Sequence, residues 1–136
     1  MPASTLPPLA VFLHSGEYDR VHQALAIGAA AAAAGRTVHL VFTWWALERL
    51  LDDRLDGPDM PHRPDVADRF EARGLPTLRQ LLQHLRESGC CTAWGCTGSL
   101  AALGRTPAEA EGKVDHLAGW STLLNVTAGM GDRFYV

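Results

Sequence analysis

Residues 9–43 read LAVFLHSGEYDRVHQALAIGAAAAAAGRTVHLVFT, and this stretch decides the fold. Its first five residues, 9–13, are continuously apolar and run into a His-Ser-Gly turn, a pattern typical of a strand buried on both faces of a parallel sheet. Apolar and small residues recur at helical spacing over 17–34, and Gly35 stands where a C-cap glycine belongs. The β-branched and apolar run 37–43 predicts a second strand. Strand, helix and strand in succession predict a βαβ unit with a right-handed crossover.

The same alternation continues along the rest of the chain. Expected strands cover 90–95, 114–117 and 133–136, and expected helices cover 46–51, 78–85, 97–103 and 120–128, with a short one opening at Thr106-Pro107. Residues 55–76 hold four prolines and two glycines and predict one long irregular loop, either a functional lid or disordered. We therefore predict a single α/β domain over 1–136, a three-layer α/β/α sandwich with a mostly parallel five-stranded sheet and a flexible N-terminus at 1–8.

Composition excludes several classes of protein. The 136 residues are 47% hydrophobic and 20% charged, as in an ordinary globular protein. The net charge of −3 argues against a nucleic-acid backbone binder, and the apolar run 24–34 is too short to cross a bilayer. No basic region followed by an apolar core opens the sequence, and the three cysteines form no CxxC pair. We expect a cytoplasmic protein without nucleic-acid or membrane partners.

The strand assignments also predict a site, because ligands of open parallel sheets bind outside the carboxyl ends of the strands. Small, polar and tryptophan side chains follow each expected strand there. The binding candidates are His14, Ser15, Gly16, Trp44, Trp45, Thr97, Gly98 and Trp120.

Cys96 is the catalytic candidate in this set. It is expected between a strand end and the first turn of a helix, where free backbone N–H groups stabilise an anion such as a thiolate. The competing interpretation is a small buried hydrophobe. Cys90 and Cys91 are expected to be packing residues inside the strand. Five residues of strand span about 16 Å, too far for a Cys91–Cys96 disulfide, so the sequence favours single-cysteine chemistry.

Histidine and tryptophan placement leaves further alternatives. No two of the six histidines have a metal-ligand spacing with a third ligand, and no glycine-rich phosphate loop occurs, so we expect no metal and no cofactor. His14 could hydrogen-bond a thiolate or a ligand, or be structural. The tryptophans could line an apolar pocket or bury against another subunit.

Three stretches of the sequence carry a recognisable pattern. Residues 9–47 show an apolar strand, a Ser/Gly turn, a helix with small residues, a G-x-x-V sequence and an apolar strand ending near an aromatic residue. The second stretch is CTGSLAALG (96–104), in which a cysteine precedes a glycine by eight residues. The third is the tail, where 114–119 leads into a helix and a terminal DRFYV. Together the three stretches resemble the DsrE/DsrF/DsrH-like proteins of sulfur relay.

The resemblance implies a flavodoxin-like domain that assembles as a homo-oligomer. It also implies that Cys96 accepts sulfane sulfur as a persulfide and exchanges it with a sulfur donor or acceptor protein or a small thiol. Two other functions stay open, a non-catalytic module that binds a small ligand in a Trp-lined crevice, and an oligomeric regulatory subunit.

Overall fold

A computed structural model describes residues 6–136 of the chain as an α/β fold around one five-stranded sheet. All of its strands are parallel, which confirms the expected α/β/α class. The sheet order is β4-β3-β2-β1-β5. The strands are β1 (Leu9–Leu13), β2 (Val38–Phe42), β3 (Cys91–Cys96), β4 (His116–Ala118) and β5 (Asp132–Tyr135).

Seven helices connect these strands in the described part of the chain. They are α1 (Tyr18–Ala33), α2 (Trp44–Leu51), α3 (Pro64–Ala72), α4 (Leu78–Glu87), α5 (Thr97–Ala102), α6 (Pro107–Ala110) and α7 (Trp120–Val126). No helix among residues 6–136 combines the length and apolar character needed to span a membrane.

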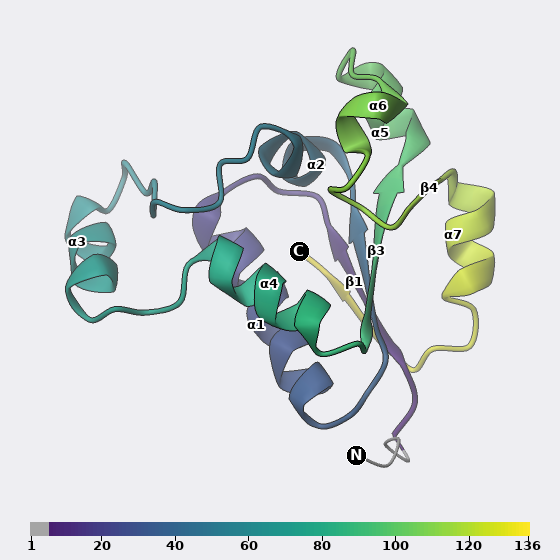
Figure 1. Cartoon of the computed structure of the whole chain (residues 1–136), viewed down its shortest axis with the longest axis horizontal. Helices are drawn as coiled ribbons and strands as arrows, with labels where there is room; N and C mark the ends of the chain where they lie inside the picture. The colour runs from purple at the N-terminus through teal and green to yellow at the C-terminus, as the bar shows by residue number, and fades with distance from the viewer. Residues whose placement is uncertain (1–5) are drawn as a thin grey trace.

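The strand order explains the unequal layers of the sandwich. From β1 to β4 the chain moves stepwise in one direction across the sheet, and right-handed crossovers place the intervening helices α1 and α4 on one face. The connection from β4 to β5 runs back across the sheet, so α7 lies on the other face (Figure 1). The layers are those of a flavodoxin-like sandwich, although flavodoxin itself has the order 2-1-3-4-5. One face is therefore deeply covered and the other only lightly.

Alternate residues of the strands supply two separate cores. Leu9, Val11 and Leu13 of β1 belong to the large core beneath α1 and α4. Ala10 and Phe12, which point the other way, belong to a small core with Leu123 of α7. Every residue of β1 is buried, as the continuous apolar run predicts.

The ends of elements follow from local sequence. Gly35 has φ 78° just after α1, the left-handed conformation that a C-cap glycine supplies without strain. Thr77 and Gln80 form a reciprocal capping box at the start of α4. This capping box fixes the C-terminal end of residues 55–76, the proline-rich segment.

Four sequence predictions need correction or completion. The segment 55–76 contains the helix α3, with Pro64 in its first turn, instead of being irregular throughout. The strand β4 begins at His116, later than predicted, and α2 begins earlier, at Trp44. Of the N-terminal stretch expected to be flexible, 1–5 lie outside the described residues, while the carbonyl of Pro7 accepts a hydrogen bond from Arg36 Nε at 2.9 Å.

Candidate functional site

The turn after β1 packs closely against the start of α2. A Cβ placed on Gly16 would lie 2.7 Å from the carbonyl oxygen of Trp45, so only glycine fits this approach. The hydroxyl of Ser15 accepts a hydrogen bond from the Glu17 amide at 3.1 Å, and His14 is exposed. A hollow of about 310 Å³ opens here and is lined by Ser15, Gly16, Glu17, Trp45, Glu48 and Arg54.

Cys96 is the last residue of β3 and the N-cap residue of α5. Its side chain is buried, 2% exposed, in the small core that also holds Phe12 and Leu123. Thr97 and Gly98, which follow it, are exposed. The strand therefore delivers the thiol to the predicted edge of the sheet but directs it beneath α7, away from solvent.

The turns that follow β3 and β4 lie side by side around this cysteine. A Cβ placed on Gly98 would lie 3.8 Å from the Cys96 sulfur, and one placed on Gly119 would lie 3.5 Å from Thr97 Oγ1. Trp120 begins α7 directly after Gly119. The N-terminal end of α7 thus borders the turn that carries the thiol.

Aromatic rings extend from Trp120 along the lightly covered face of the sheet. Phe12 stacks on Trp120 with ring centroids 5.9 Å apart and on Tyr135 at 4.8 Å. Trp120 is 47% exposed and Tyr135 is 69% exposed. We call Phe12, Trp120 and Tyr135 the aromatic patch.

Trp44 and Trp45 form another pair, with ring centroids 5.6 Å apart. Both are exposed at the start of α2. The predicted site residues therefore divide into two groups. His14, Ser15, Gly16, Trp44 and Trp45 surround the turn after β1, whereas Cys96, Thr97, Gly98 and Trp120 surround the turn after β3.

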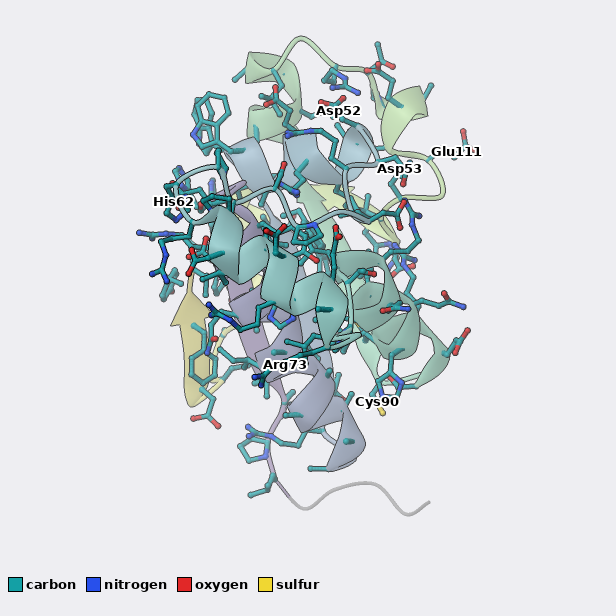
Figure 2. All side chains as sticks on the ribbon, turned by 90° about the vertical axis from the view of Figure 1, so that its left-hand side faces the viewer. Asp52, Asp53, His62, Arg73, Cys90 and Glu111 are labelled. Atoms are coloured by element: carbon teal, nitrogen blue, oxygen red, sulfur yellow. The ribbon has the colours of Figure 1, made fainter. Side chains whose placement is uncertain are left out.

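The other two cysteines lie at the opposite end of β3 from Cys96. All three thiols are free. Burial is the main cause that raises the pKa of the Cys91 thiol to about 11, which keeps it protonated at neutral pH. The Cys90 sulfur donates to the Ser88 carbonyl at 3.7 Å, and it lies at the edge of the molecule, far from Asp52 and Asp53 (Figure 2).

Sequence reasoning did not single out a buried arginine, Arg49, on α2. Its Nη1 donates to the Gly16 carbonyl at 2.9 Å and its Nη2 to Asp59 Oδ1 at 2.6 Å. Its position between Leu47 and Leu50, which α2 also buries, is the sequence feature that could have indicated the burial of Arg49. A charged residue on the apolar side of a helix needs a partner, and here that partner comes from the proline-rich segment.

No protein-family model matches the chain, and no curated protein matches its sequence. Within residues 6–136 no three His, Cys, Asp or Glu side chains gather in a group that would hold a metal ion.

Proposed function

We propose that the protein is a sulfur-relay protein that carries sulfane sulfur as a persulfide on Cys96, acting as a sulfur carrier or sulfurtransferase in a reducing cytoplasm. The observation that carries this proposal is the position of Cys96 at the carboxyl end of β3, where a helix begins. This is the place that the resemblance to DsrE/DsrF/DsrH-like proteins gives to the sulfur acceptor. The partners are then a sulfur donor or acceptor protein, or a small thiol.

The chemistry is an exchange at sulfur without net oxidation. The Cys96 thiolate attacks the outer sulfur of a donor persulfide, R–S–SH. A new sulfur–sulfur bond forms on Cys96 while the donor bond breaks, and the R–S⁻ leaving group takes up the proton that the Cys96 thiol lost. In the second half, an acceptor thiolate attacks the same outer sulfur and Cys96 leaves as a thiolate.

The burial of Cys96 sets a condition on this exchange. Its side chain packs in one core cluster with Phe12 and Leu123, so a donor reaches the sulfur only when α7 moves or when the donor is small. Helix α7 has seven residues, of which Leu123 alone is buried. It is thus a weakly anchored cover, and local opening there costs less than unfolding the sheet.

The test is the intact mass of the protein after exposure to polysulfide. Wild type should gain one sulfur atom, reversed by a reducing thiol, and Cys96→Ser should gain none. The matched control is the double variant Cys90→Ser/Cys91→Ser, which should gain sulfur as wild type does. If Cys96→Ser gains as much as wild type, Cys90 or Cys91 carries the sulfur and the proposal is wrong.

The aromatic patch favours a second candidate function, a non-catalytic oligomeric module. Trp120 and Tyr135 stand exposed on the face that only α7 covers, and such aromatic side chains are enriched at protein interfaces. We propose that two or more copies of the chain meet through this face. Such an interface would border the turn that carries Cys96, because Trp120 follows Gly119, which lies against Thr97.

Analytical ultracentrifugation tests the assembly. Tyr135→Glu places a charge in the patch and should shift a wild-type oligomer to monomer. Trp44→Ser changes an exposed tryptophan outside the patch and should leave the oligomer intact. A monomeric wild type, or equal dissociation by both variants, would exclude this interface.

A further inference from the structure

Strand β5 forms one edge of the sheet and is the yellow arrow at the left margin of Figure 2. The Val136 amide donates to the Phe12 carbonyl at 2.8 Å, and the Val136 carbonyl accepts from the His14 amide at 2.7 Å. Because main-chain groups alternate in direction along a strand, those of Arg133 and Tyr135 point away from β1. In the described part of the chain these outward groups make no hydrogen bond. Such an edge can accept a further strand.

Apolar side chains are exposed on both sides of this edge. The register pairs Tyr135 with Phe12 and Phe134 with Val11, so Tyr135 lies on the lightly covered face and Phe134 on the face of α1 and α4. Tyr135 is 69% exposed and Phe134 is 38% exposed. Edge strands that stay free in water commonly carry an exposed charge, a proline or a bulge that prevents pairing. Exposed aromatic residues on both sides favour an edge that another strand covers.

The two charged residues of β5 are held within their own copy. Arg36, whose side chain is 14% exposed, donates to Asp132 Oδ2 at 2.7 Å. Arg133 donates from Nη2 to the carbonyl of Thr127, just after α7, and its Nε is buried. The guanidinium of Arg133 is therefore turned inward, and its aliphatic stem lies nearer the edge. Neither charge opposes the approach of a second strand.

A second copy of the chain fits this edge in one register. A two-fold axis through the edge makes the two β5 strands antiparallel. Only one register pairs both outward residues of each strand, with Arg133 opposite Tyr135 of the second copy and Phe134 opposite its own counterpart on the axis. The Cα atoms of such a non-hydrogen-bonded pair lie about 4.5 Å apart, so the two Phe134 rings meet. A register centred on Arg133 would set two arginines opposite each other, which is unfavourable.

We infer that two copies pair antiparallel through β5 and join their sheets into one continuous sheet, with Phe134 on the two-fold axis. On the other face, each Tyr135 packs against the stem of Arg133 of the second copy, beside Phe12 and Trp120 of the aromatic patch. The inference rests on the oligomeric function proposed above, because Tyr135 belongs to both the patch and the edge. It adds the partner strand and its register.

Charge exchange at Phe134 tests this register, since that residue lies outside the aromatic patch. Phe134→Glu and Phe134→Lys each set like charges opposite each other on the axis, and each should raise the Kd of the dimer at least about hundredfold in analytical ultracentrifugation. An equimolar mixture of the two variants should form dimers again, because Glu then faces Lys. Leu75→Glu, at an exposed apolar residue of the proline-rich segment, should leave the wild-type assembly intact.

Cross-linking tests the same contact without a charge. Phe134→Cys in the Cys90→Ser/Cys91→Ser background should give a disulfide-linked dimer on mild oxidation, because facing Cα atoms about 4.5 Å apart suit a disulfide. Leu75→Cys in the same background should stay uncross-linked. Non-reducing electrophoresis measures both.

The outcomes separate the edge pairing from the assembly on which it rests. A monomeric wild type overturns both. If Tyr135→Glu dissociates a wild-type oligomer but Phe134→Cys gives no cross-linked dimer, the copies meet through the lightly covered face alone, so the assembly stands and the edge pairing is wrong. The edge pairing is also wrong if folded Phe134→Glu and Phe134→Lys keep the oligomer, or if their mixture stays monomeric.

Discussion

Asp59, about half exposed in the proline-rich segment, accepts a hydrogen bond of 2.6 Å from Arg49, whose side chain is 4% exposed. This pair fastens a segment of low apolar content to the sheet edge. Arg49 in turn holds the turn after β1 through the Gly16 carbonyl. One guanidinium therefore joins α2, the turn after β1 and the proline-rich segment.

Removing Asp59 alone should lower the stability more than removing both Arg49 and Asp59. Asp59→Ala leaves a buried guanidinium without its counter-charge and should lower the free energy of unfolding by about 2 kcal/mol. The double variant Arg49→Met/Asp59→Ala should recover part of that loss. Urea denaturation measures both. Asp65→Ala is the control, because the Arg63–Asp65 pair is about half exposed on both sides and should contribute little to stability.

Helix α7 should control access to Cys96. Leu123 is its buried anchor, so Leu123→Ala should destabilise the protein by about 3 kcal/mol and open space beside the thiol. The rate of Cys96 alkylation by iodoacetamide, followed by mass spectrometry, should rise.

Two controls separate local opening from global unfolding in that experiment. Leu124→Ala alters an exposed neighbour and should change neither stability nor rate. Leu25→Ala creates a cavity in the other core and should accelerate alkylation only as far as global unfolding does. Equal acceleration by Leu25→Ala and Leu123→Ala would show that α7 is no gate.

Replacement by alanine should have different effects on stability at two glycines near the sheet edge. Gly16→Ala places a Cβ 2.7 Å from a backbone oxygen that cannot rotate away, and should cost about 1–3 kcal/mol of stability. Gly98→Ala meets only the Cys96 sulfur at ordinary contact distance, 3.8 Å, within the helix α5. Because alanine is the better helix former, this variant should be neutral or slightly stabilising. Thermal unfolding of both variants measures the contrast, and a stable Gly16→Ala would refute the close approach.

The fold could be predicted from sequence because its signals are local. The apolar run of β1, the cap glycine Gly35 and the alternation of helices and strands each act over a few residues and agree with one another. Helix α3 was missed because its apolar side consists only of Val66, Ala67 and Phe70, which are partly buried. The four prolines of residues 55–76 around it are typical of a loop.

The site was predictable only in part. The rule for parallel sheets places Cys96 at the carboxyl edge, and the structure agrees on that position. Its direction into the small core depends on the register of β3 and on α7, which pack across large sequence separations. The pairing of Arg49 with Asp59 likewise depends on how the proline-rich segment returns to the sheet, which no local pattern records.

A histidine in the sheet should make the stability depend on pH. His39 Nδ1 accepts a hydrogen bond of 3.1 Å from Trp94 Nε1, and burial lowers the pKa of His39 below 6.5. The unfolded chain therefore takes up this proton first as the pH falls, and protonation of Nδ1 breaks the bond to Trp94. The contribution is present above pH 6.5 and is lost as the pH falls through the pKa of the folded protein. His116, whose ring is tilted against that of Trp94 with centroids 4.7 Å apart, is unchanged in both wild type and variant.

His39→Gln keeps an acceptor for Trp94 without a titrating ring. Below pH 6.5 the stability of wild type should fall more steeply than that of the variant, by at most about 1.4 kcal/mol per pH unit for one proton. Urea unfolding at several pH values measures both slopes. His84→Gln, which removes an exposed histidine of α4, should follow wild type. If His39→Gln and wild type lose stability in parallel, His39 is not the group that makes folding sensitive to acid.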